Sequence, residues 1–353
     1  MQVSLRMPTL QLPVLLCSLS LLPTAPLSPA ASVALQPHFA APALLSPTAR
    51  LAACVYMEED LEFGDVDELF KTAPKLKDEC VIQENLETFI HKICELTPQL
   101  VCITSGGTSV PLERNCVRFL QNFSSGNRGA VSTEYFLQAG YAVIFLYKRN
   151  SIQPYSRRVL ECFKPNDSSS VQDRIELIKC AVQLHHEAII QGKLLEVSYE
   201  TIIEYLQLLC LIARSMNCLE KRAMFYLAAA VADFYVPWDV MDVHKIQSGA
   251  GPITIQLALV PKMIKALRKQ WAPSAFCVSF KLETDPTILV KKAKDALHKY
   301  NVHAVVANEL TTRDEMVIVV TNEGDKTIKK DLDVEMKLVQ FLKEKHREFI
   351  EGK

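Results

Sequence analysis

The sequence lacks an excess of charge of either sign. Its 353 residues include 39 Lys and Arg against 40 Asp and Glu, and the basic residues are scattered along the chain. A protein that binds nucleic acid or an anionic membrane usually carries a basic patch or a basic overall balance. The composition therefore predicts neither nucleic acid nor a membrane as a partner.

The 11 cysteines lack the spacing of a metal site. The chain contains no Cys-x-x-Cys pair and no cluster of Cys and His at zinc-binding spacing, and most of the thiols lie in apolar runs. Buried, reduced thiols in a reducing compartment account for this pattern. We therefore expect neither disulfides nor structural zinc, and we expect the protein to be cytoplasmic.

Residues 1–56 lack Asp and Glu altogether and are rich in Pro, Ser, Ala and Leu, so that no long helix is expected there. Three interpretations remain open. The apolar run 14–22 resembles the core of a signal peptide, but it is shorter than the roughly 20 residues of a membrane span. The composition also fits a transit peptide for a plastid or other organelle. We favour the third, a leader that is disordered or removed, with Met57 as an alternative start and residues 57–353 as a single domain.

From about residue 84 onward, apolar runs typical of strands alternate with segments of helical periodicity. This alternation predicts an α/β fold, a Rossmann-like and mostly parallel sheet flanked by helices. Such sheets bind ligands at the carboxyl ends of their strands. The predicted strands are 100–104, 141–147, 224–230, 253–259, 276–282, 302–307 and 316–320, and the predicted helices are 126–139, 174–191, 201–216, 262–269, 286–300 and 334–349.

Two glycine-containing segments follow the first strand. The segment Thr104-Ser105-Gly106-Gly107-Thr108 is either a plain tight turn or a place where backbone N–H groups approach a phosphate. The loop 118–129 leads into a predicted helix at Gly126, where Ser124 or Ser125 could cap the helix or the free N–H groups could bind an anion.

Two further segments stand at or after the strand 224–230. Consecutive alanines, Ala228 to Ala230, allow a ligand to press against the backbone, and Asp233 adds one fixed charge. The polar segment 244–249 contains Lys245 and has the composition of a mobile hairpin or flap, at about residues 240–260. A tightly packed strand and a solvated surface lysine are the plain alternatives.

Taken in order, these segments resemble the phosphopantothenoylcysteine synthetases, also called phosphopantothenate–cysteine ligases, of the monofunctional eukaryotic type. The resemblance spans about residues 85–330 and includes two further motifs, Phe280-Lys281-Leu282-Glu283-Thr284-Asp285 and Val306-Ala307-Asn308. It implies an enzyme of coenzyme A biosynthesis that joins 4′-phosphopantothenate to L-cysteine through an acyl-nucleotide intermediate. It also implies a homodimer, with Mg²⁺ and either ATP or CTP as the nucleotide, of which we favour ATP.

The resemblance also assigns roles to individual residues. Asn122 would stabilise the intermediate of the second step, and Lys245 would close over the phosphates. Asp233 and Glu283 are possible metal ligands, but the sequence names no metal site. The nucleotide would bind to Gly106, Ser124, Gly126, Gly129, Phe280 and Asn308, and phosphopantothenate would bind to Asn122, Ala229, Ala230, Asp233 and, across a dimer interface, Arg118.

Two alternatives belong to other functional classes. An NADP-dependent Rossmann-type oxidoreductase would share the fold, but the first strand is not followed by Gly-x-Gly-x-x-Gly, and no tyrosine has a lysine four residues later. The second predicted strand ends in Tyr147-Lys148-Arg149, where such enzymes usually carry an acidic residue for the cofactor ribose. Only a cofactor with a 2′-phosphate would tolerate these basic residues. A non-catalytic binding protein on the same scaffold would be free to lose Asn122, Asp233 and Lys245.

Overall fold

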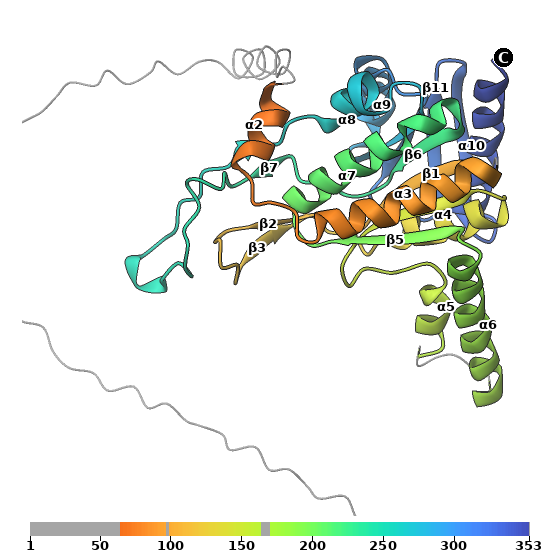
Figure 1. Cartoon of the computed structure of the whole chain (residues 1–353), viewed down its shortest axis with the longest axis horizontal. Coiled ribbons are helices and arrows are strands. Elements are labelled where there is room, and N and C mark those ends of the chain that lie inside the picture. Colours follow the sequence, from red (N-terminus) through yellow and green to blue (C-terminus); the bar gives the residue numbers. More distant parts are fainter. Residues whose placement is uncertain (1–63, 97–98, 164–169, 353) are drawn as a thin grey trace, which may run out of the picture. The chain divides into compact units, whose positions relative to one another are not determined.

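The computed structural model describes residues 64–96, 99–163 and 170–352, and the other residues are drawn as a grey trace in Figure 1. The predicted leader, residues 1–56, lies outside the described residues. The prediction that it is disordered or removed, like the single-domain boundary at residue 57, stays a prediction.

The core of the protein is an eight-stranded sheet with the order β12-β11-β10-β9-β6-β1-β4-β5. Neighbours from β5 through β10 pair in parallel, and β11 and β12 add an antiparallel edge. Numbered along the chain, the parallel strands follow the doubly wound order 3-2-1-4-5-6, which confirms the predicted Rossmann-like fold. The strands are β1 (Leu100–Ser105), β4 (Ala142–Lys148), β5 (Leu194–Tyr199), β6 (Ala223–Leu227), β9 (Phe276–Glu283), β10 (Ala304–Glu309), β11 (Met316–Thr321) and β12 (Gly324–Lys329).

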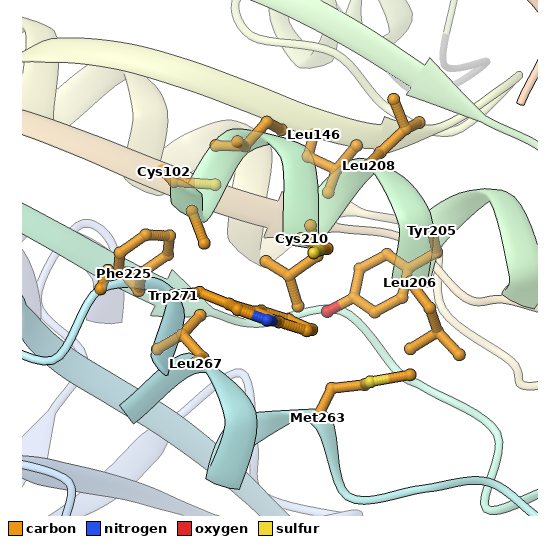
Figure 2. Close-up of a cluster of buried hydrophobic side chains, with 14 of the residues drawn as sticks. Cys102, Leu146, Tyr205, Leu206, Leu208, Cys210, Phe225, Met263, Leu267 and Trp271 are labelled. Carbon is orange, nitrogen blue, oxygen red and sulfur yellow. The ribbon is translucent and has the colours of Figure 1, made fainter. Parts of the chain in front are cut away.

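Helices cover both faces of this sheet. One face packs against α4 and α10, and the other packs against α3, α7, α8 and α9. Figure 2 shows part of the second face, where Tyr205 and Leu206 of α7 lie near Met263, Leu267 and Trp271. The helices are α2 (Gly64–Thr72), α3 (Glu79–Leu96), α4 (Asn127–Gln138), α5 (Ser156–Glu161), α6 (Val171–Ile190), α7 (Ile202–Met216), α8 (Met263–Ala266), α9 (Pro286–Tyr300) and α10 (Val334–Glu351), with short 3₁₀ turns η1 (Asn217–Arg222) and η2 (Ser248–Ala250) and a π turn η3 (Leu267–Trp271).

Local sequence signals set several helix starts. Asp285 caps α9 by accepting a hydrogen bond from the Thr287 N–H, and Pro286 occupies the first helical turn, as the sequence predicted. Thr201 and Glu204 form a reciprocal capping box at the start of α7. The stretch Ile202–Arg222 is long and apolar enough to span a membrane by length and composition alone, but most of the side chains of α7 are buried in the core.

The predicted strand 253–259 is wrong over most of its length. Only Ala258–Leu259 forms a strand, β8, which pairs with β7 (Phe234–Tyr235). Residues 253–257 alternate in polarity, but they are exposed and pair with no strand in the described part of the chain. Several elements were not predicted from the sequence: α3, β5, β12 and the hairpin of β2 (Ser109–Pro111) and β3 (Phe119–Gln121).

Two neutral histidines lie where α10 meets the sheet: His346 is buried and His303 is half-buried. The His346 ring bonds to the Tyr141 hydroxyl at 2.8 Å and to the Lys221 carbonyl at 2.9 Å. Burial lowers the pKa of His346 to about 4. Burial and the nearby Arg268 and His346 lower the pKa of His303 to about 3.

We therefore expect acid to destabilise the fold. Below the ordinary histidine pKa of 6.5 the unfolded chain takes up protons that the folded chain does not, so stability falls as the pH falls. Each histidine contributes a loss of about 2 kcal/mol between pH 6.5 and pH 5. Urea unfolding of the wild type and of His346→Gln at several pH values measures the effect. The free energy of unfolding of the variant should fall about half as much over this pH range as that of the wild type. An equal fall in both proteins would contradict the prediction.

Candidate active site

The carboxyl ends of β1 and β6 are joined to each other beyond the sheet. Within the sheet, Thr104 is the register partner of Leu227. Past the strand ends, the Ala230 N–H donates to the Gly106 carbonyl at 2.8 Å, and the Thr108 N–H donates to the Ala230 carbonyl at 3.1 Å. The turn 104–108 and the segment 228–233 are therefore held in one hydrogen-bonded frame, at the point where the strand order reverses.

Two glycines allow other parts of the backbone to approach this frame closely. Gly106 has a φ of +87°, and a Cβ on it would lie 2.5 Å from the Lys148 Cβ. A Cβ on Gly107 would lie 1.9 Å from the Asn122 carbonyl oxygen. Because larger residues cannot be accommodated without displacing the backbone, these positions require glycine.

Asn122 lies between the two strand ends. Its N–H donates to the Thr108 carbonyl at 3.2 Å, and its side-chain Nδ2 donates to the Val231 carbonyl at 3.3 Å. Asp233 follows Val231 by two residues. Gly106, Asn122 and Asp233, to which the resemblance assigns roles in one site, are thus brought to the same edge of the sheet.

The start of α4 packs against the end of β1. Gly126 is the N-cap, with a φ of +83° and no side-chain cap for the helix. The Ser105 hydroxyl donates to the Gly126 carbonyl at 3.0 Å, and a Cβ on Gly129 would lie 2.4 Å from the same hydroxyl oxygen. The Ser124 hydroxyl accepts only a long hydrogen bond, 3.4 Å, from the Gly126 N–H. The positive end of α4 is therefore available to an anion beside β1.

Phe280 and Asn308 lie on the same face of the sheet as α4. Phe280 packs edge-on against Tyr226, with ring centroids 4.8 Å apart, and the Tyr226 hydroxyl bonds to Ser132 of α4 at 2.8 Å. Asn308 is only 6% exposed, and its Oδ1 is buried with no hydrogen-bond partner among the described residues. An unpaired buried acceptor of this kind is rare in proteins, and a ligand N–H would satisfy it.

The acidic residues near this edge are paired with lysines. Lys262 Nζ lies 2.8 Å from Asp233 Oδ1. Glu283 lies between Lys281 and Lys292; burial raises its pKa, but the two lysines outweigh burial and hold the pKa below its usual value. Within the described residues no group of three or more His, Cys, Asp or Glu side chains is placed to hold a metal ion.

The predicted flap is attached to the loop that follows β2. In Figure 1 the teal segment around residues 240–260 extends beyond the sheet on the side of β2 and β3. The Arg114 N–H donates to the Asp242 carbonyl at 2.7 Å, and the Asn115 N–H donates to the Val243 carbonyl at 3.0 Å. Lys245 is exposed, and its ammonium forms no ion pair within the described part of the chain. Arg118 donates to Glu113 and to the Ile246 carbonyl.

The sequence reading missed two buried charged residues beside the frame. Lys148 is 6% exposed, and its ammonium donates to Ser109 Oγ at 2.9 Å and to Glu200 Oε1 at 2.5 Å. Glu113 is fully buried. Lys148 could have been noticed in the sequence, because it stands at the end of a predicted buried strand. No local feature of the sequence pointed to Glu113.

Comparisons with known proteins found a matching family model, similar curated proteins and similar solved structures. A family model described as the DNA/pantothenate metabolism flavoprotein C-terminal domain matches residues 195–345. This chain is 49% identical over 303 residues to phosphopantothenate–cysteine ligase 2 of Oryza sativa subsp. japonica, covering 81% of this chain and 94% of the relative. It is 43% identical over 272 residues to the phosphopantothenate–cysteine ligase of Homo sapiens, covering 71% and 88%. A solved structure of a Cab2 mutant in complex with phosphopantothenate-cysteine has a TM-score of 0.75 and 34% identity, covering 81% of this chain and 99% of that one.

The contact between Gly107 and Asn122 predicts that Gly107→Ala is destabilising. The new Cβ would meet a backbone oxygen that cannot move without displacing the hairpin, so we expect a loss of about 1–3 kcal/mol. Gly249→Ala is the control, because a Cβ there meets nothing within 4 Å and its φ is not positive. Thermal unfolding measures both variants, and equal midpoints would contradict the prediction.

Proposed function

Because the chain belongs to the phosphopantothenate–cysteine ligase family, we propose that it joins 4′-phosphopantothenate to L-cysteine through an acyl-nucleotide intermediate. Its relatives are named for this ligation, which belongs to coenzyme A biosynthesis. The alternative of an NADP-dependent oxidoreductase is not supported, because the curated relatives are ligases. The single observation that carries the residue assignments is the joined frame of β1 and β6, with Asn122 between the two strand ends.

The reaction has two steps. The phosphopantothenate carboxylate attacks the α-phosphorus of the nucleotide, pyrophosphate leaves, and a mixed anhydride forms. The cysteine amine then attacks the acyl carbon, loses a proton, and the nucleoside monophosphate leaves. A free carboxylate is a poor acyl donor at neutral pH, so the nucleotide supplies the leaving group, and the protein supplies positioning and charge stabilisation.

We assign the triphosphate to the cradle of Gly106, Ser124, Gly126 and Gly129. The support is the uncapped start of α4, whose N–H groups and positive dipole end face the end of β1. The base would lie against Phe280, with Asn308 Oδ1 accepting a hydrogen bond from it. Both adenine and cytosine carry an exocyclic amino group that can donate, whereas guanine and uracil carry a carbonyl at the equivalent position. We propose ATP, with CTP as the second candidate.

Phosphopantothenate would lie along the other side of the frame. Ala229 and Ala230 present small side chains there, and the Ala229 N–H is already bonded to the Thr104 hydroxyl at 3.1 Å, which fixes the backbone. Asp233 would contact the substrate at the end of this segment. Asn122 holds Val231 by a weak bond of 3.3 Å, so its amide can turn to an acyl oxygen at small cost.

We propose that Mg²⁺ accompanies the triphosphate. Mg²⁺ usually keeps several waters and binds through one or two carboxylates and the substrate phosphates. The described residues fit this arrangement and not a protein-made cage, because Asp233 and Glu283 are single carboxylates that already pair with lysines. The ion would neutralise phosphate charge, and Lys245 would add a further positive charge when the flap closes.

We further propose that the ligase acts in the cytoplasm. The support is chemical: Cys80, Cys116 and Cys180 are exposed free thiols, which a reducing compartment keeps reduced.

Pyrophosphate release tests the chemistry. The full chain with ATP, Mg²⁺ and phosphopantothenate should release pyrophosphate, and adding cysteine should yield phosphopantothenoylcysteine; GTP should serve poorly. Asn122→Ala should lower product formation on the order of a hundredfold while nucleotide affinity changes little, because one oxyanion-stabilising donor is lost. Equal losses in both would mean that Asn122 only shapes the pocket, and no pyrophosphate from the wild type would refute the function.

We also propose a homodimer formed through the hairpin of β2 and β3 and the flap. All three residues of β3 are exposed, and apolar side chains that flank it in the chain or belong to the flap are exposed as well. A contiguous exposed apolar patch is typical of an interface. A second copy is the expected occupant, because Arg118 beside this patch is the residue that the family resemblance assigns to the neighbouring site. The exposed apolar residues are Val117, Phe119, Leu120, Phe123, Val240 and Val243.

A charged substitution in the patch should separate the subunits. We expect Leu120→Asp to sediment as a monomer and to lose most ligase activity, because Arg118 can no longer reach a partner's site. Leu332→Asp is the control, since Leu332 is 77% exposed on the loop before α10, outside the patch. Analytical ultracentrifugation and the pyrophosphate assay measure both variants. A fully active monomer would contradict the proposed role of Arg118.

A further inference from the structure

Glu113 is a buried carboxylate at the junction between the β2–β3 loop and the flap. Its side chain has no exposed surface. Its Oε2 accepts hydrogen bonds from the N–H groups of Val117 at 3.4 Å and Arg118 at 3.2 Å. Its Oε1 accepts from Arg118 Nε at 3.1 Å and from the Ile246 N–H at 3.4 Å. One carboxylate thus holds two segments that are 133 residues apart in the chain.

Arg118 completes the connection. Its Nη2 lies 3.0 Å from Glu113 Oε1 and donates to the Ile246 carbonyl at 2.5 Å. Both the N–H and the carbonyl of Ile246 are therefore bound by the Glu113–Arg118 pair. Together with the backbone bonds from Arg114 and Asn115 to the flap, this pair joins residues 113–118 and 242–246 into one unit. We refer to Glu113, Arg118 and Ile246 as the flap junction.

Removing the Glu113 charge from water costs free energy, and a surface loop can be held without that cost. Burial raises the pKa of Glu113, but the N–H groups of Arg118, Ile246 and Val117 and the Arg118 guanidinium outweigh burial, so the pKa lies below its usual value and the carboxylate is ionised at neutral pH. Hydrogen bonds between backbone N–H and carbonyl groups would be enough to hold a hairpin loop. A fully satisfied buried ion pair adds a fixed relative geometry, and breaking it leaves an uncompensated charge.

We propose that Glu113 is a positioning residue that couples the flap to the loop of Arg118, so that Lys245 and Arg118 take their working positions together. Lys245 directly precedes Ile246 in the chain, and Arg118 is the other side chain that Glu113 holds. The inference rests on the proposed roles of Lys245 and Arg118. In the proposed dimer it has a further consequence: flap closure in one subunit would set the arginine that serves the partner's site.

Hydrogen exchange on the wild-type full chain tests the coupling without any substitution. The probe is α,β-methylene-ATP with Mg²⁺, whose binding is measured separately by calorimetry. The amides of Val117, Arg118 and Ile246 all donate to Glu113, so nucleotide binding should slow their exchange together and by similar factors. If the analogue binds and Ile246 alone is protected, or none of the three responds, the coupling is wrong. If the analogue does not bind, the proposed nucleotide site itself fails.

Glu113→Gln tests the role of the charge. We expect trypsin to cleave after Lys245 about tenfold faster and the KM for phosphopantothenate to rise about tenfold, since charge-assisted hydrogen bonds are lost. Asp333→Asn is the matched control: Asp333 also accepts two bonds from an arginine, Arg157 at 2.8 and 3.2 Å, but it stands just before α10, away from the flap. The control should lower thermal stability and leave flap cleavage and KM unchanged.

The two variants separate the outcomes. If Glu113→Gln lowers only thermal stability, as Asp333→Asn does, the residue is merely structural and the inference is overturned. If the wild type shows no ligase activity, the proposed function fails, while faster cleavage after Lys245 in Glu113→Gln still supports the junction.

Discussion

The paired ends of β1 and β6 are the constraint on which the candidate site depends. In a doubly wound sheet the chain leaves neighbouring strands in opposite directions at the switch point, which opens a crevice for a ligand. Here the two segments that follow β1 and β6 stay hydrogen-bonded to each other for several residues beyond the sheet, through Gly106, Thr108 and Ala230. Asn122 can therefore approach both at once. A nucleotide on one side of this frame and an acyl substrate on the other would meet at a fixed distance, which is what transfer through a mixed anhydride needs.

Close packing of backbone against backbone explains why small residues dominate the frame. Gly107 lies against the Asn122 carbonyl, and Gly129 lies against the Ser105 hydroxyl. Glycine is needed at these two positions because it leaves space for a close contact, not because it makes the chain flexible. They bring the start of α4 onto the end of β1, so that the positive end of the helix is part of the same rigid body as the two strand ends.

The sequence predicted what depends on local pattern, and it failed where distant segments meet. The strand ending at Thr104, the alanines after β6 and the cap at Asp285 all carry local signals, and the parallel sheet follows from the alternation of elements. Residues 253–257 also alternate, but no neighbouring strand is there to pair with them among the described residues, so the pattern misled. Glu113 and Ile246 are 133 residues apart, and no local feature of either announces their contact.

The distribution of paired charges explains why a movable lysine is needed. A triphosphate brings several negative charges to the site, yet the nearby lysines are already engaged: Lys262 with Asp233, and Lys281 and Lys292 with Glu283. Within the described residues the Lys245 ammonium forms no such pair. A cation on a flap can arrive after the nucleotide, when the substrate charge compensates its loss of hydration, whereas a fixed unpaired cation in the open site would stabilise the ground state equally. The flap then has to be placed accurately although it lies outside the sheet, and the buried carboxylate of Glu113 supplies that placement.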